Sequence, residues 1–301
     1  MTGEQRPKVV YVVGAGRSGS TIIGVALGNC ADVFFAGELH LWLGRGGRSP
    51  IRGANRNERA EFWARVAADV DVPDDFPRRE ARFLEKTGAL FRLDRRRAQR
   101  RLRGSYRRIT EQLYGAVSRA ASVTHVVDTS HFPRRALELQ TLPGIDLYLL
   151  FVVRDPRSVV SSYSRDEADF RQFNVLTTNA YLWLTYGLSV VAFLRQPRRR
   201  RLLVRYEQFM ADPEAVLGEI LAWSGAPPDA PEMSALRTGF AFQGNNLLRQ
   251  EVVALERRPE QHVQGSRLTR LVNLPWTLLF SRLGPAATAG RRPPAAPGAE
   301  R

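Results

Sequence analysis

The stretch Gly14–Gly24, GAGRSGSTIIG, follows the apolar run Val9–Val13 and decides how the rest of the chain is interpreted. A continuous apolar strand that ends in a glycine-rich loop before a helix is typical of nucleotide-binding α/β proteins. The glycines satisfy the G-x-G-x-x-G dinucleotide fingerprint. Their spacing also fits a Walker A loop, although a serine stands where the Walker lysine would be. The loop alone leaves both interpretations open.

A third interpretation treats the polar side chains of the loop as a cradle for a sulfated or phosphorylated group. A fixed cation and several hydroxyl donors at a helix N-terminus are suited to binding such an anion. The side chains of this cradle are Arg17, Ser18, Ser20 and Thr21.

Composition describes a globular chain without a membrane span. The 301 residues are 44% hydrophobic, and no apolar stretch reaches the length of about 18 residues that a transmembrane helix needs. The N-terminal residues lead into a strand without the apolar core of a signal peptide. Cys30 is the single cysteine and is expected in the core. We therefore expect a cytoplasmic protein.

The formal net charge of +15 favours an anionic partner. Only Lys8 and Lys86 are lysines among 45 basic residues, so the excess is carried by arginine. The segment Arg92–Arg108 holds nine arginines and one acid. A solvated helix face is the simpler explanation of this segment, and a nucleic-acid surface is the alternative.

Strand and helix patterns alternate along most of the chain. Apolar runs at 8–13, 33–36, 125–128, 146–153 and 201–206 predict strands, and amphipathic stretches between them predict helices. Repeated strand–helix units predict an α/β fold with a parallel sheet flanked by helices, in which ligands bind at the carboxyl ends of the strands.

One segment interrupts this alternation. Residues 42–122 are helical in pattern and rich in arginine, so we interpret them as a helical insertion that caps the acceptor side. Residues 1–283 would form a single domain, and the Pro/Ala/Gly-rich tail at 284–301 is expected to be disordered.

A second motif, FVVRDPRSVVSSY at 151–163, separates the interpretations of the first loop. Arg154 stands at the carboxyl end of the strand 146–153, Asp155 is placed to cap the next helix, and Ser162 follows two turns along it. A guanidinium beside a hydroxyl predicts a second phosphate site. A dinucleotide oxidoreductase would leave both residues unused.

The pairing of GAGRSGST with VRDPRSVVSSY resembles the sulfotransferases that use 3′-phosphoadenosine-5′-phosphosulfate (PAPS), above all their tyrosylprotein and carbohydrate branch and its bacterial relatives. The resemblance implies a P-loop-like fold in which PAPS is the co-substrate. Arg154 and Ser162 would hold its 3′-phosphate. The first loop would hold the 5′-phosphosulfate through Gly16, Arg17, Ser18, Gly19, Ser20 and Thr21.

Four further segments extend the resemblance. FFAGEL implies that Glu38 is a catalytic carboxylate, and VRYEQFMADPEAVL implies that Tyr206 belongs to the nucleotide site. GNNLLRQ resembles an element that closes over the nucleotide with Arg249, although it carries one extra residue. In DTSH, His131 replaces a lysine that relatives place near the transferring group.

Sulfuryl transfer resembles phosphoryl transfer, which depends on alignment and charge stabilisation, and we expect no metal requirement. Arg17 would stabilise the transferring group, and Glu38 would accept the proton of the acceptor. His131 is the competing base; if Glu38 is the base, His131 would be protonated and support the departing oxygen. The acceptor is expected to be a small molecule or a glycan.

Two other functions remain in competition. The run HVVD at 125–128 resembles a Walker B strand, which would suit an ATP-dependent kinase that needs Mg²⁺. The arginine-rich segment would suit a nucleic-acid-binding protein, but we expect no nucleic-acid partner. The sequence does not indicate an oligomeric state.

Overall fold

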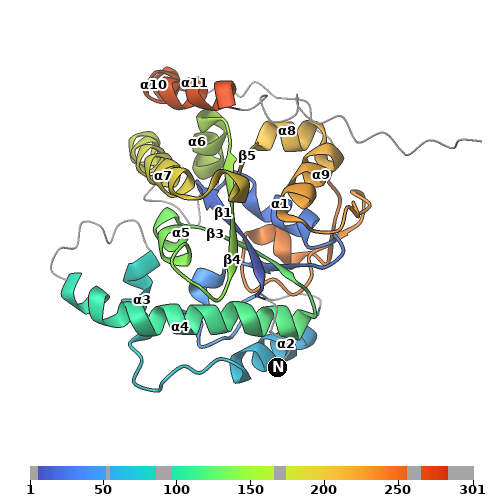
Figure 1. Cartoon of the computed structure of the whole chain (residues 1–301). Coiled ribbons are helices and arrows are strands. Elements are labelled where there is room, and N and C mark those ends of the chain that lie inside the picture. The colour runs from blue at the N-terminus through green and yellow to red at the C-terminus, as the bar shows by residue number, and fades with distance from the viewer. Residues whose placement is uncertain (1–5, 52–54, 86–95, 166–173, 256–265, 284–301) are drawn as a thin grey trace, which may run out of the picture.

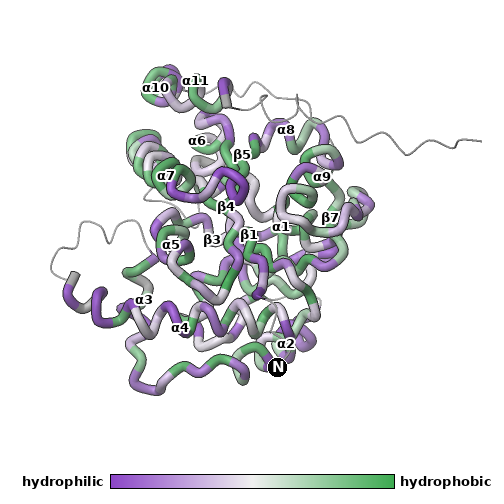
Figure 2. Tube along the Cα trace, in the orientation of Figure 1, coloured by the Kyte–Doolittle hydropathy of each residue, from purple (hydrophilic) through white to green (hydrophobic). Residues whose placement is uncertain are grey.

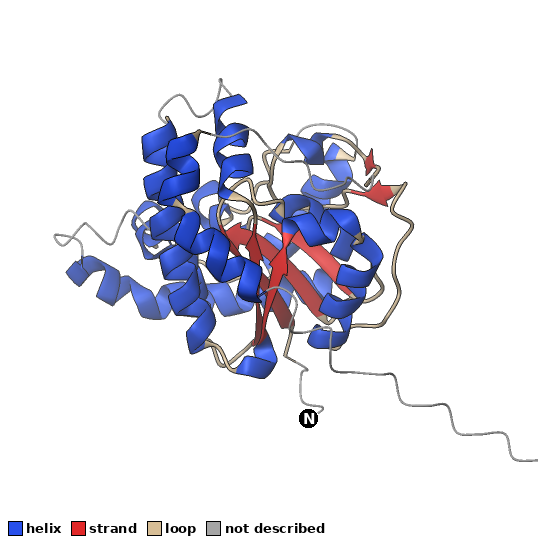
Figure 3. Ribbon diagram, turned by 90° about the horizontal axis from the view of Figure 1, so that it is seen from above, coloured by secondary structure: helices blue, strands red, loops and turns tan. Residues whose placement is uncertain are grey.

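A five-stranded parallel sheet forms the centre of the molecule (Figures 1 and 3). The computed structural model describes residues 6–51, 55–85, 96–165, 174–255 and 266–283. In spatial order, the strands are β2 (Val33–Gly37), β3 (His125–His131), β1 (Lys8–Gly14), β4 (Asp146–Val153) and β5 (Arg201–Arg205). All five were predicted from the apolar runs, and the α/β class with a P-loop-like sheet is confirmed.

The central strand β1 contributes to two hydrophobic cores, one on each face of the sheet. Val9, Tyr11 and Val13 pack into the first core, and Val10 and Val12 pack into the second. Successive side chains of a strand point to opposite faces, so a strand buried on both faces must be apolar throughout. This is why the run preceding the glycine loop does not alternate with polar residues.

Helices cover both faces of the sheet. In Figure 1, α5 and α7 lie on one side of the strands and α1, α8 and α9 on the other. The helices are α1 (Ser20–Leu27), α2 (Arg56–Ala68), α3 (Arg78–Glu85), α4 (Arg96–Ala121), α5 (Pro133–Leu139), α6 (Pro156–Arg165), α7 (Val175–Arg195), α8 (Tyr206–Ala211), α9 (Pro213–Ser224), α10 (Arg267–Val272) and α11 (Leu274–Leu283). Among the described helices, none combines the length and the apolarity that a membrane span needs.

The insertion predicted at 42–122 contains α2, α3 and α4, and these helices pack onto the first core. Tyr106, Ile109, Leu113 and Val117 form the buried stripe of α4 at helical spacing. Figure 2 shows the corresponding alternation of hydrophilic and hydrophobic turns along this helix. The predicted tail at 284–301 lies outside the described residues.

A buried ionic network joins the insertion to the sheet. Arg135 on α5 is 2% exposed; its Nη1 pairs with Glu85 of α3, and its Nη2 lies 3.3 Å from Oδ2 of Asp128 on β3. Tyr106 and Tyr114 of α4 donate hydrogen bonds to Glu85 (2.7 Å) and Asp128 (2.6 Å), respectively. Burial raises the pKa of Glu85 to about 7, although the guanidinium of Arg135 opposes this rise.

Several arginines of α4 lie within reach of carboxylates on neighbouring elements. Arg103 and Arg107 form ion pairs with Glu138 of α5, and Arg108 pairs with Asp71 at 2.6 Å. These three arginines therefore form ion pairs within the protein, as expected for a solvated helix face. The part of the segment before residue 96 lies outside the described residues.

Candidate active site

The glycine-rich loop has a backbone that only small residues can form. Gly14 and Gly19 have φ angles of 145° and 92°. A Cβ on Gly14 would lie 2.3 Å from the carbonyl oxygen of Val152, and one on Gly19 would lie 2.1 Å from the ring of Tyr206. The loop is therefore pressed between β4 and α8, and glycine is required at both positions.

The helix that follows the loop begins without a side-chain cap. The N-cap of α1 is Gly19 in the left-handed conformation, and Ser20 is the first helical residue. The first amides of a helix have no acceptor within it, so this end is suited to binding an anion. Because no side chain caps α1, the amides at its N-terminus are available to bind an anion.

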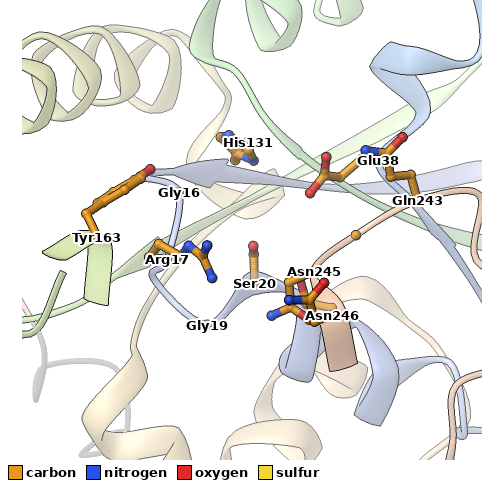
Figure 4. Close-up of a pocket in the computed structure, with 12 residues that line it drawn as sticks. Gly16, Arg17, Gly19, Ser20, Glu38, His131, Tyr163, Gln243, Asn245 and Asn246 are labelled. Carbon is orange, nitrogen blue, oxygen red and sulfur yellow. The ribbon is translucent and has the colours of Figure 1, made fainter. Parts of the chain in front are cut away.

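A cavity of about 310 Å³ lies directly above this helix end. Figure 4 shows Arg17 and Ser20 on one side of it and Glu38 and His131 on the other. The cavity is lined by Gly16, Arg17, Gly19, Ser20, Thr21, Glu38, His131, Tyr163, Gln243, Gly244, Asn245 and Asn246. Of the loop residues predicted to bind the nucleotide, five line it, whereas Ser18 is 1% exposed and its Oγ has no hydrogen-bond partner.

Glu38 stands at the end of β2, where the chain leaves the sheet. Its backbone N–H donates to the carbonyl of Gln243 at 2.8 Å, so a segment far along the chain holds it in place. Burial raises the pKa of the Glu38 carboxyl to about 7, and the negative charge of Asp128 adds to the rise, while Arg17 opposes it. A carboxyl that titrates near neutral pH is suited to accept a proton during turnover.

His131 stands at the end of β3 in the left-handed conformation, with φ 55°. Its Nδ1 lies 3.3 Å from the carbonyl oxygen of Thr129. Because a carbonyl only accepts, Nδ1 carries the proton in this contact and Nε2 is left as an acceptor. Burial lowers the pKa of His131 below its ordinary value, although the contact with the Thr129 carbonyl and the charge of Asp128 oppose this shift. The role of His131 as a protonated group beside the departing oxygen stays a prediction.

A second cavity, of about 250 Å³, adjoins the first and shares Arg17, Gly19 and Asn245 with it. Arg154 and Ser162 both line the second cavity, so the structure brings together the two residues that the sequence paired. Tyr206 lines it as well, with its ring centroid 4.4 Å from Cζ of Arg154. The N-terminal end of α6 begins as predicted, since Arg157 donates its backbone N–H to Oδ1 of Asp155 at 2.7 Å.

Arg249 lies elsewhere. It lines a third cavity, of about 580 Å³, together with Arg45, Pro50 and Ile51. The segment Gln243–Asn246 separates this cavity from the first, because these residues line both. The short helix Asn246–Arg249 places Arg249 on the side of the third cavity. Asn245, which precedes this helix, lines both the first and the second cavity.

Several residues of the site were not predicted. Tyr181 of α7 accepts a hydrogen bond from the backbone N–H of Gly16 at 2.8 Å, and a Cβ on Gly16 would lie 2.5 Å from the hydroxyl of Tyr163. The hydroxyl groups of Tyr163 and Tyr181 therefore lie against the backbone of the loop at Gly16. In the segment GNNLLRQ the asparagines Asn245 and Asn246 line the cavity, whereas the sequence pattern indicated Arg249.

Asp128, the acid that resembled a Walker B residue, does not face the cavity. It is fully buried, and its oxygens accept hydrogen bonds from Tyr114, Ser130 and Arg135. Among the described residues, there is no group of three or more His, Cys, Asp or Glu side chains that could hold a metal ion. The kinase interpretation therefore loses the acid on which it depended.

Comparisons with known proteins agree with this geometry. The profile described as "Sulfotransferase family" matches residues 7–230. A search of curated protein sequences returns no significant match. Two solved structures are similar with a TM-score of 0.51: the sulfotransferase domain from the curacin biosynthetic pathway (14% identity, 91% of this chain and 99% of the other) and the sulfotransferase domain from the Synechococcus PCC 7002 olefin synthase (17% identity, 91% and 96%).

These matches define the class. The fold of this chain is similar to that of the two sulfotransferase domains, and the profile covers most of the chain. The chain belongs to the sulfotransferase family. It is an enzyme that transfers a sulfuryl group, and the kinase and nucleic-acid alternatives are not favoured.

Proposed function

We propose that this sulfotransferase moves the sulfuryl group of PAPS to a hydroxyl or amine of a small-molecule or glycan acceptor. The observation that carries the proposal is the pair of cavities that meet at Arg17 and Gly19. One contains the helix N-terminus and the candidate base, and the other contains Arg154 and Ser162. Two adjoining cavities, each with groups that can bind an anion, are suited to a nucleotide with a phosphate on each side of its ribose.

The second cavity would hold the 3′-phosphate. The guanidinium of Arg154 is already fixed, because its Nη1 donates to the carbonyl oxygen of Arg17 at 3.0 Å and its face lies against Tyr206. The remaining donors of Arg154 and the hydroxyl of Ser162 would bind phosphate oxygens. The hydrogen bond to Arg17 also couples this site to the loop that would hold the 5′-phosphosulfate.

The first cavity would hold the reacting atoms. The acceptor oxygen or nitrogen attacks sulfur in line with the bond to the 5′-phosphate oxygen, and that oxygen leaves with the bonding electron pair. Glu38 would take the proton of the acceptor, and Arg17 with the amides at the start of α1 would stabilise charge on the sulfuryl and leaving oxygens. His131, through Nε2, would accept a hydrogen bond from the acceptor and orient it.

No step of this mechanism uses a metal ion, because the loop amides and arginines supply the positive potential. The insertion at 42–122 would contribute to acceptor choice, since Arg45, Pro50 and Ile51 line the cavity beyond Gln243. The cytoplasmic location expected from the sequence remains part of the proposal.

Calorimetry with adenosine 3′,5′-bisphosphate tests the nucleotide assignment. The bisphosphate should bind at least about tenfold more tightly than AMP, because one charged phosphate contact is worth more than about 1.4 kcal/mol. Equal affinity for the two nucleotides would rule out the 3′-phosphate site. A mass-spectrometric search of extracts incubated with enzyme and PAPS for added sulfonate would then identify the acceptor.

A further inference from the structure

A further cavity, of about 400 Å³, lies between residues 46–51 and α2, away from the residues assigned to the nucleotide. Three arginines line it, and the lining residues include no acid. Alanines of α2 form much of the remaining wall and leave the space open. The arginines are Arg48, Arg56 and Arg59, and the alanines are Ala60, Ala64 and Ala67.

Arg59 is the residue that makes this cavity unusual. It is 3% exposed, and its Nη2 donates to the carbonyl oxygen of Gly239 at 2.9 Å. Its Nε and Nη1 are buried and have no hydrogen-bond partner among the residues that the structure describes. Buried charges in proteins are paired or hydrogen-bonded in nearly every case, because the loss of water is otherwise uncompensated.

The described part of the protein also provides no charge that balances Arg59. Burial lowers the pKa of its guanidinium, and no carboxylate among the described residues forms an ion pair with it. Arg48 and Arg56 are exposed and add positive charge at the mouth of the same cavity. Three cations that share one cavity repel one another unless an anion lies between them.

The cavity is connected to the active site through two features. The cavity that contains Arg45 and Arg249 shares Ile51 with the Arg59 cavity and Gln243–Asn246 with the reaction cavity. In addition, the segment 239–243 contacts both sites. The carbonyl of Gly239 accepts a hydrogen bond from Arg59, and the carbonyl of Gln243 accepts one from the backbone N–H of Glu38.

We propose that the Arg59 cavity binds an oxyanion group, namely a carboxylate, sulfate ester or phosphate. The group belongs either to the acceptor or to a free anion. The acceptor assignment rests on the proposed function; the anion site itself does not. An acceptor anchored here would extend past Arg45 and Arg249 towards Glu38, and it would therefore be an anionic, elongated molecule.

Inorganic sulfate is the probe for the site itself. Thermal unfolding is followed over a sulfate series in which chloride keeps the ionic strength constant, for wild type, Arg59→Met, Arg56→Ala and Arg65→Ala. Arg65 is exposed on the same helix and lines none of these cavities, so Arg65→Ala is the matched control. Sulfate bound by the nucleotide loop affects all four proteins alike, and their differences isolate the Arg59 cavity.

Wild type and Arg65→Ala should gain the same rise in Tm with sulfate. In Arg56→Ala and Arg59→Met the apparent dissociation constant for the additional sulfate should increase about tenfold or more. Arg56 is exposed, so Arg56→Ala is expected to fold normally. It therefore tests the proposal even if Arg59→Met does not fold. An identical sulfate dependence in Arg56→Ala and Arg65→Ala would overturn the proposal, whether or not PAPS is the co-substrate.

Turnover distinguishes the two sources of the anion. If the group belongs to the acceptor, sulfate competes with the acceptor found by the sulfonate search, and Arg56→Ala raises KM for that acceptor with little change in kcat. If the anion is free, sulfate raises Tm through the same residues without competing with the acceptor.

Discussion

Nη1 of Arg154 donates a hydrogen bond of 3.0 Å to the carbonyl oxygen of Arg17, and this contact joins the two motifs that lie 137 positions apart in the chain. The arginine from the end of β4 therefore shapes the loop that follows β1. A loss of Arg154 would remove a phosphate ligand and also loosen the loop. The two sites are expected to act as one unit.

Arg154→Ala should weaken the binding of adenosine 3′,5′-bisphosphate by about 2–3 kcal/mol and that of AMP by less, since hydrogen bonds to charged groups are worth about 1.5–3 kcal/mol. Ser162→Ala should cost about 1 kcal/mol, as expected for a neutral hydroxyl. Calorimetry measures both. Arg157→Ala is the control, because Arg157 pairs with Asp155 and lines neither cavity. A loss in Arg157→Ala as large as in Arg154→Ala would contradict the assignment.

Gly19→Ala should abolish nucleotide binding while most of the fold is retained. The new Cβ would lie 2.1 Å from the ring of Tyr206, and φ of 92° is unfavourable for any L residue, so the loop must change shape. Gly187→Ala is the matched control: no atom lies within 4 Å of its Cβ position on α7, and alanine favours a helix by up to about 1 kcal/mol. Normal bisphosphate affinity in Gly19→Ala would show that the loop is not the binding element.

The raised pKa of Glu38 predicts how activity depends on pH. A base acts when deprotonated, so kcat/KM should rise with pH through about 7, the pKa of this carboxyl. Glu38→Gln should lower kcat by about 10²–10⁴ and leave bisphosphate affinity unchanged. His131→Gln removes the competing base. If Glu38→Gln turns over normally and His131→Gln is inactive, histidine is the base.

The same group predicts a change in stability. The carboxyl has an ordinary pKa of 4.5 and a folded pKa of about 7, so the folded state binds more protons between these values. The free energy of unfolding contributed by Glu38 should therefore fall as pH rises through this window. Chemical denaturation of wild type and Glu38→Gln at several pH values measures the difference, which should be absent below pH 4.5. A wild-type stability that increased relative to that of Glu38→Gln as pH rose from 4.5 to 7 would contradict the raised pKa.

Arg135→Met should destabilise the protein by about 3–5 kcal/mol, because it leaves Glu85 and Asp128 buried without their common cation. Arg134→Met on the same helix is the control. Arg134 is partly exposed and should cost less than about 1 kcal/mol. Urea unfolding followed by circular dichroism gives both values. Equal costs for the two substitutions would mean that the network contributes no more than an ordinary surface contact.

The strands, the loop and the pairing of Arg154 with Ser162 could be predicted because each is a local pattern. An apolar run predicts a buried strand, and a charge at its end predicts a ligand edge. The roles of Tyr181 and Gln243 could not be predicted, since their contacts with Gly16 and Glu38 join distant parts of the chain. The lowered pKa of His131 could not be predicted either, because burial depends on tertiary packing.

The burial of Arg59 could have been predicted from the spacing of its apolar neighbours. Arg59 precedes Phe62, Trp63 and Val66 at spacings of three, four and seven, which place it on the apolar face of α2. A charge at such a position indicates a buried ion pair or a ligand. Helical periodicity alone could not show which of the two applied, because that depends on the residues packed against the face.

The buried ionic network of Arg135, Glu85 and Asp128 limits which substitutions and segment exchanges this enzyme can accept. An insertion taken from a relative would place different residues against Arg135 of α5 and Asp128 of β3. Where these residues did not pair with Arg135 and Asp128, a charge would be buried without a partner and the fold would be destabilised. Chimaeras must therefore be cut so that all three positions come from one parent. Under the proposed role of the insertion, substitutions at the exposed Arg45 and Arg48 would alter acceptor preference without disturbing the interior, whereas the buried Gly47 between them has a positive φ and must be kept.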